Sequence, residues 1–210
     1  MADWATISAL ATAGGTLVLA AATFASVRSA NRASRTAERA LLAGLRPVLV
    51  PSRFQDPPEK IGFMDEHWVK VEGGRAVAEV VDGVVYLAIA LRNVGSGIAV
   101  LDRWDFFPMR ALNDVPHRDP AEYRRLTRDL YVPPGDLGFW QGAFRDFEDP
   151  TCSEAAAAIK AKQPITIDLF YGDHEGGQHT ISRFGLIPRA DGAWITAVSR
   201  HWNIERDDPR

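Results

Sequence analysis

The feature that most constrains this sequence is an uncharged stretch near its N-terminus. From Trp4 to Val27 the chain has 24 residues without a formal charge, bounded by Asp3 and Arg28. A helix needs about 20 mostly apolar residues to cross the hydrocarbon core of a bilayer. The strongly apolar side chains of this stretch contribute about −3 kcal/mol to insertion, from which Gly, Ser and Thr subtract. We therefore expect a transmembrane helix within residues 1–27.

Three other interpretations of this stretch fit the sequence less well. A cleaved signal peptide has its positive charge before the apolar run, whereas here the charge follows it. An interfacial helix needs a strongly polar face, which this stretch lacks. A buried helix of a soluble protein would rarely extend over 24 residues without a charge. A retained membrane-spanning helix fits the pattern better than any of these.

A basic segment follows the uncharged stretch. Between Arg28 and Arg46 there are five arginines and one glutamate, which give a net charge of +4. Lys and Arg in short loops stay on the cytoplasmic side of a membrane. We therefore predict a protein of the bacterial inner (cytoplasmic) membrane, with its N-terminus outside and its C-terminal domain in the cytoplasm.

The arginines of this segment also form a stripe. On a continuous helix they would lie within a sector of about 60°. Pro47 has no amide hydrogen to donate, so the sequence predicts a helical stalk over residues 28–46 that ends before it. The stripe either contacts anionic lipid head groups or an acidic partner, or only fixes the topology. The predicted contact residues are Arg28, Arg32, Arg35, Arg39 and Arg46.

Small residues recur at four-residue spacing in the uncharged stretch. They are Ala5, Ala9 and Ala13, and then Ala21 and Ala25. Small residues at this spacing allow helix backbones to approach closely in lipid. Association of two copies through this helix is one interpretation, and a high general content of alanine is the other.

After Pro47 the hydrophobic pattern changes to a period of two. Asp82-Gly83 separates two apolar runs and is a strong signal for a tight hairpin turn. Further alternating stretches are separated by Gly, Pro or Asp. They are residues 67–72, 98–107, 137–145, 164–171, 178–187 and 193–204. Eight or nine strands without regular βαβ alternation predict a mainly β domain over residues 47–210, an antiparallel β-sandwich for which we favour an immunoglobulin-like topology.

Two short helices are expected to interrupt these strands. Asp119 is followed by a proline and then by Glu122, an arrangement typical of a helix start, and we predict a helix that ends near Asp129. Thr151 and Glu154 form a second capping box before an alanine-rich run that Pro164 limits.

Two segments carry a resemblance to known proteins. The run LRNVGSGIA, residues 91–99, is similar to a strand-end motif of many small bacterial β-sandwich domains. The C-terminal pattern SRFGLIPR, Trp194 and RHWNI resembles a family of single-pass membrane proteins from high-GC bacteria with a C-terminal β-sandwich domain. The resemblance implies this architecture and no particular activity.

Charge and cysteine content exclude some classes of function. Residues 47–210 carry 19 basic and 25 acidic side chains, a net charge of −6. Nucleic-acid binding depends on clustered Lys and Arg, so no nucleic-acid partner is expected. Cys152 is the single cysteine, which excludes an internal disulfide and a zinc site built from cysteines.

The densest group of chemically able side chains lies between Tyr171 and His179. Asp173, His174 and His179, together with His201 on a later strand, are the candidates for a metal or hydrolase site. A plain hairpin loop with its turn at Gly176-Gly177 explains the same residues. The sequence contains no HExxH, Walker loop, dinucleotide-binding turn or GxSxG motif. We therefore expect no catalytic residues, metal or cofactor here, and keep these four residues as the alternative.

Three other features of the sequence are better explained as structural. Trp194, Val198 and Trp202 would share one face of a strand that fills the core, with His201 on the other face. The turn formed by residues 93–97 has no helix after it, so phosphate binding is not expected. Cys152 has no base close to it in the sequence that would activate it.

The prediction from the sequence is a membrane-tethered, non-enzymatic binding or scaffold module. Its β-sandwich would be presented to a protein partner, and the lipid bilayer would hold its helix. One alternative is a membrane-associated hydrolase that uses the 173–179 loop. A second is an accessory structural subunit of a larger membrane complex.

Overall fold

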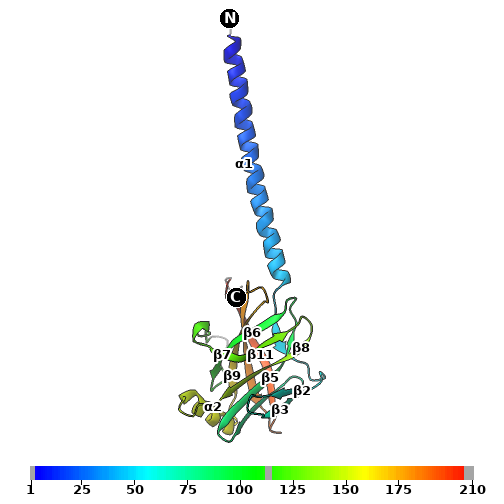
Figure 1. Ribbon diagram of the computed structural model, residues 1–210, viewed down its shortest axis with the longest axis vertical. Coiled ribbons are helices and arrows are strands. Elements are labelled where there is room, and N and C mark those ends of the chain that lie inside the picture. Colours follow the sequence, from blue (N-terminus) through cyan, green and yellow to red (C-terminus); the bar gives the residue numbers. More distant parts are fainter. Residues whose placement is uncertain (1–2, 112–114, 206–210) are drawn as a thin grey trace. The chain divides into compact units, whose positions relative to one another are not determined.

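A computed structural model describes residues 3–111 and 115–205, which form two units (Figure 1). Residues 1–43 constitute a helical unit and residues 44–210 a β unit. The expected architecture, an N-terminal helix followed by a mainly antiparallel β domain, is confirmed.

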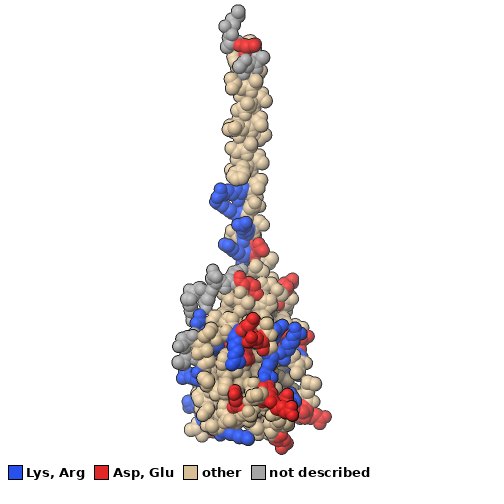
Figure 2. All heavy atoms as spheres, turned by 90° about the vertical axis from the view of Figure 1, so that its left-hand side faces the viewer, with Lys and Arg blue, Asp and Glu red and all other residues tan. Residues whose placement is uncertain are grey.

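Helix α1 (Trp4–Gly44) is a single α-helix of 41 residues. Its part from Ile7 to Leu42 is long and apolar enough to cross a membrane. Large apolar side chains such as Leu17 and Phe24 are exposed on it. In Figure 2 the surface of α1 is uncharged over most of its N-terminal part, and arginines appear after it.

The stalk ends slightly earlier than expected. Because α1 stops at Gly44, Arg46 lies outside the helix and does not extend the stripe. The four arginines from Arg28 to Arg39 lie on α1 and are exposed. Their spacing places them on one face of the helix.

The β unit is built from two antiparallel sheets. The small sheet pairs β2 (Glu59–Gly62) with β3 (Trp68–Val71). The large sheet has nine strands: β1 (Leu49–Pro51), β4 (Arg75–Val81), β5 (Val84–Asn93), β6 (Ala99–Phe107), β7 (Arg124–Val132), β8 (Leu137–Phe144), β9 (Ile165–Gly172), β10 (His179–Pro188) and β11 (Trp194–Asn203).

The large sheet is curled around a hydrophobic core. Its strand order is β1-β5-β4-β11-β10-β9-β6-β7, and β8 pairs with β5 as well. The curl brings β7 and β8 into contact, so the sheet comes close to closing on itself. The main core takes side chains from both halves of the curl, such as Leu87 and Ile89 on β5 and Ile167 on β9. An immunoglobulin-like topology stays a prediction.

The predicted hairpin at Asp82-Gly83 is confirmed. Val81 pairs with Val84, which leaves a two-residue turn between β4 and β5. Both turn residues have positive φ, 49° at Asp82 and 84° at Gly83. This combination matches the right-handed twist of paired strands and is tolerated by Asp and Gly.

The helix predicted from Asp119 to Asp129 is wrong. The Asp119 side chain does accept a hydrogen bond from the Ala121 amide, but only a 3₁₀ turn, η1 (Pro120–Glu122), follows. From Arg124 the chain is strand β7, in which Leu130 and Val132 are buried and pair with β6. Strand pairing and burial of these apolar side chains outweigh the local capping signal.

The second predicted helix exists but begins earlier. Helix α2 (Pro150–Lys160) has Asp149 as its N-cap, which accepts a hydrogen bond from the Thr151 amide. Thr151 is therefore not the cap. Pro150 suits the first helical position because its missing amide hydrogen would have no partner there.

A β-bulge corrects the assignment of faces on β11. Arg183 pairs with Arg200 and Phe184 pairs with Val198, so Ser199 is an extra residue that reverses the alternation. Trp194 and Val198 face the main core, but Trp202 lies in a separate cluster on the opposite side. His201 is turned toward the core side, contrary to the prediction.

The glycine-rich run after β5 holds the beginning of the β unit. The side-chain nitrogen of Asn93 donates to the carbonyl oxygens of Gly97 (2.7 Å) and Val132 (2.9 Å). Its side-chain oxygen accepts from the amides of Val48 (3.1 Å) and Gly95 (2.9 Å). We call Asn93 with these four partners the Asn93 clamp.

Close backbone approach explains the glycines of the clamp. A Cβ at Gly95 would lie 2.4 Å from the Arg46 carbonyl oxygen, and one at Gly97 would lie 1.7 Å from that of Leu45. Such distances are impossible for a side chain. The run therefore needs glycine because the segment that follows α1 passes directly over it.

Replacing Asn93 with Ala should lower the free energy of unfolding of the β unit by about 3 kcal/mol or more, because buried groups lose their partners. Val94→Ala is the matched control, since the Val94 side chain is exposed and should change stability by less than about 0.5 kcal/mol. Chemical denaturation of the detergent-solubilised protein, followed by tryptophan fluorescence, measures both values. Equal stabilities of the two variants would contradict the importance of the clamp.

Candidate functional site

The loop between β9 and β10 is a hairpin connection, as predicted, but part of it is buried. Gly172 pairs with His179, which leaves residues 173–178 as the loop. Residues 174–177 are exposed. Gly176 has positive φ (72°), the conformation that this turn requires of a glycine.

Asp173 organises this loop and is buried. Its Oδ1 accepts hydrogen bonds from the amides of Glu175 and Gly177, both at 3.0 Å. Its Oδ2 accepts from the Gln178 side chain at 3.3 Å. A carboxylate surrounded by donors of its own loop acts as a structural group.

The histidines named with Asp173 have separate partners. His174 is exposed and lies 3.3 Å from Glu175. His179 stacks on Phe170 with a centroid distance of 5.1 Å and binds Glu205 with both its ring and its amide. Within residues 3–111 and 115–205, no three His, Cys, Asp or Glu side chains are grouped to hold a metal ion.

His201 belongs to a buried hydrogen-bond chain. Its Nδ1 lies 2.6 Å from the Ser182 hydroxyl, which lies 2.8 Å from the Tyr171 hydroxyl. The Tyr171 hydroxyl accepts a hydrogen bond from the Leu49 amide at 3.0 Å. Burial raises the pKa of Tyr171. A serine beside a histidine can be a nucleophile with its base. Ser182, however, is fully buried on the core side of the sheet, where no substrate reaches it.

The outer face of the sheet carries a buried ion pair that the sequence analysis missed. Arg183 donates from Nε to Asp168 Oδ1 (2.8 Å) and from Nη2 to Asp168 Oδ2 (2.7 Å). Both side chains are fully buried and are direct cross-strand neighbours on β10 and β9. The guanidinium also lies over the rings of Phe107 and Trp202. Charges buried in this way need complete pairing.

Residues before β7 cover this ion pair. The carbonyl oxygen of Val115 accepts from Arg183 at 2.6 Å, and Arg118 binds Asp105, the neighbour of Asp168 across β6 and β9. Burial raises the pKa of Asp105. Burial also raises the pKa of Tyr123, and the negative charges of Asp168 and Asp105 raise it further.

Cys152 is also a structural residue. It is buried in α2, and burial raises the pKa of its thiol. A reactive thiol needs the opposite shift, because the thiolate is the nucleophile.

A pocket of the β unit lies in the seam between β7 and β8. The two strands are consecutive in the chain, yet β7 pairs with β6 and β8 pairs with β5. In the part of the chain that the structure describes, no hydrogen-bonded ladder joins them. At one end they touch, since a Cβ at Gly138 would lie 2.6 Å from Val132 Cγ2. Toward Arg124 and Phe144 a pocket opens between them.

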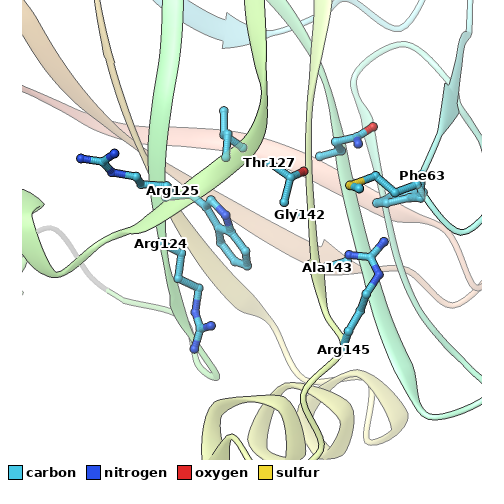
Figure 3. A pocket seen from close by; sticks show the side chains of 11 residues that line it. Phe63, Arg124, Arg125, Thr127, Gly142, Ala143 and Arg145 are labelled. Carbon is cyan, nitrogen blue, oxygen red and sulfur yellow. The ribbon is translucent and has the colours of Figure 1, made fainter.

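We call the pocket between β7 and β8 the seam pocket (Figure 3). It is lined by Phe63, Met64, Trp104, Arg124, Arg125, Leu126, Thr127, Gln141, Gly142, Ala143 and Arg145, and its volume is about 120 Å³. Figure 3 shows Arg124 and Arg125 extending from β7, with Gly142, Ala143 and Arg145 on the opposite side. Three of its described lining residues are arginines and none is a carboxylate.

The floor of the seam pocket is aromatic. Trp104 lines the pocket, and the fully buried Trp140, which does not line it, meets the Trp104 ring edge to face at a centroid distance of 5.1 Å. Gly142 makes room for them, because a Cβ there would lie 2.7 Å from Trp140 and 2.9 Å from Trp104. The floor is therefore rigid and apolar, and the rim is cationic.

The arginines of the rim are held differently. Arg124 pairs with Asp149 at 2.5 Å and Arg145 pairs with Asp65 at 3.1 Å, both carboxylates outside the pocket lining. Arg125 is exposed, and no carboxylate of the described residues forms an ion pair with it. The run of arginines in residues 124–128 was the sequence signal for this basic rim. Because a helix was predicted there, the arginines were not assigned to a strand edge.

Comparisons with models of protein families, with curated proteins and with solved structures found no match. The inference of function therefore depends on the geometry of the seam pocket and on the composition of α1.

The double change His174→Ala with His179→Ala should cost less than about 1 kcal/mol of stability, because both side chains lie at the surface. Asp173→Ala should cost about 2 kcal/mol, since three loop donors lose their acceptor. Thermal denaturation compares these variants, and elemental analysis measures bound metal before and after the histidine changes. A stoichiometric metal that disappears in the double variant would establish a metal site in this loop.

Proposed function

We propose that this chain is a membrane-tethered, non-enzymatic binding module. Helix α1 crosses the bacterial inner membrane with the N-terminus outside, and the β unit binds a protein partner in the cytoplasm. The observation that carries the proposal is the division of α1 into a long uncharged part and an exposed arginine stripe. A helix of this composition favours the bilayer, and the positive side favours the cytoplasm.

The stripe also supports contact with lipid. Arg28, Arg32, Arg35 and Arg39 are exposed on α1 and follow the apolar part directly. Each basic side chain near an anionic membrane surface contributes about 1 kcal/mol to binding. We propose that these residues contact the head groups of the inner leaflet, and that Arg46, outside the helix, does not.

The seam pocket supports a binding function of the β unit. It combines an aromatic floor with a cationic rim at a place where two strand edges are unpaired. The three histidines considered for a hydrolase site each contact a different residue and do not form one site. His174 contacts Glu175, His179 contacts Glu205 and His201 contacts Ser182. The hydrolase is therefore not our proposal.

The membrane topology can be tested with reporter fusions after residue 210. A reporter that works only in the cytoplasm should be active, and one that works only in the periplasm should be inactive. The reason is that the arginine stripe holds the C-terminal side of α1 in the cytoplasm. Replacing Arg28, Arg32, Arg35 and Arg39 with Gln should weaken this preference. A periplasm-active fusion of the wild-type chain would overturn the orientation.

Purification from native membranes in mild detergent tests the binding function. We expect a protein partner to remain with the full chain and to be lost when residues 47–210 are replaced by an unrelated soluble domain. A partner that both versions retain binds through α1, which would favour an accessory subunit of a larger complex. Absence of any partner from both versions would contradict the proposal.

A further inference from the structure

One edge of β8 lies beside the seam pocket and pairs with no other strand of the described residues. Eight residues of β8, Leu137 to Phe144, pair without interruption with β5. A strand paired on one side presents a regular row of amide and carbonyl groups on the other. Contact with β7 closes this edge as far as Gln141. We propose that an extended acidic segment of a partner protein adds as a short strand to the open part of the edge, from Gly142 to Phe144.

The shape of β7 leaves room for such a segment. Arg125 pairs with Arg103 and Leu130 pairs with Leu101, so residues 126–129 of β7 lie opposite Asp102 alone. This insertion of residues interrupts the pairing of β7 with β6 at the place where the pocket opens. Arg128 crosses the seam and donates to Gln141 at 2.9 Å, which marks the closed end of the proposed site.

The positive charge of the site favours a partner segment with negative charge. The described lining of the pocket holds three arginines and no carboxylate. Arg124 and Arg145 pair with Asp149 and Asp65 outside the lining, so Arg125 is the rim arginine without a described ion-pair partner. Since the whole β unit carries a net negative charge, the basic seam is a local feature. Charge complementarity of this kind fixes register and raises the association rate.

The apolar surface of the site fits the alternation of a strand. Met64 is 77% exposed at the rim, and the partly buried Leu126 lies across the pocket. In an added strand successive side chains point to opposite faces. Carboxylates can therefore reach Arg125 and Arg145 while the apolar residues between them contact Met64 and Leu126.

A second copy of this chain is a poor occupant of the same edge. It would bring its own Arg124, Arg125 and Arg145 to the seam, and like charges that face each other are destabilising. A separate acidic protein avoids this repulsion. The inference rests on the proposed binding function and specifies its partner.

A direct test uses a short fluorescent peptide of alternating glutamate and valine with the full chain in detergent. Fluorescence anisotropy should show saturable binding with a Kd below about 1 mM. A peptide with lysine in place of glutamate should bind at least about tenfold more weakly. A glutamate–valine peptide methylated on alternate backbone amides should also lose binding, because strand addition depends on those amides.

Two charge reversals give matched variants. Arg125→Glu should weaken binding of the acidic peptide at least about tenfold. Arg189→Glu makes the same charge change at an exposed position in the turn after β10 and should leave binding within about twofold. Circular dichroism of both variants checks that the fold is kept, and neither side chain has a described ion-pair partner to lose.

Several outcomes would overturn the inference: no binding to the wild-type chain, equal losses in both variants, or full binding of the methylated peptide. The copurification experiment separates this inference from the proposed function. A native partner retained by the Arg125→Glu variant would keep the binding module but place its contact elsewhere. Peptide binding without any native partner would keep the β8 site and contradict the proposed function.

Discussion

The arrangement of the β unit depends on the hydrogen bonds of Asn93. This one amide joins the segment that follows α1, through Val48, to the end of β7, through Val132. The backbone of Asn93 also binds the turn between β7 and β8, through Gly135 and Asp136. Because Val48, Val132, Gly135 and Asp136 are all fixed to this one buried residue, the end of the curled sheet is closed at this point.

Closure at the Asn93 end leaves the other end of the seam open. β7 and β8 touch at Val132 and Gly138, and they separate toward Arg124 and Phe144 because each keeps its own neighbour in the sheet. A fully closed barrel would have paired these edges. The seam pocket is thus a consequence of the topology. Charged side chains such as its arginines disfavour edge-to-edge pairing of strands.

Burial on both faces of β9 explains the polar network of the unit. Ile167 and Leu169 face the main core, whereas Asp168 faces outward and is still fully buried. The segment that begins at Val115 covers this face and supplies carbonyl oxygens to Arg183. A buried ion pair contributes little net stability, but breaking it by removing one partner is costly. The network therefore fixes how this segment lies on the sheet.

The sequence by itself determined the features that depend on near neighbours in the chain. The uncharged stretch and Pro47 predicted α1 to within two residues of its end, and the Asp82-Gly83 turn predicted its hairpin. Tertiary structure decided what depends on distant contacts. Pairing with β6 made residues 124–132 a strand despite the capping signal at Asp119, and the bulge at Ser199 exchanged the faces of His201 and Trp202. The seam pocket forms only when the sheet curls, because its residues come from segments around positions 63, 104, 125 and 142 that pattern alone cannot bring together.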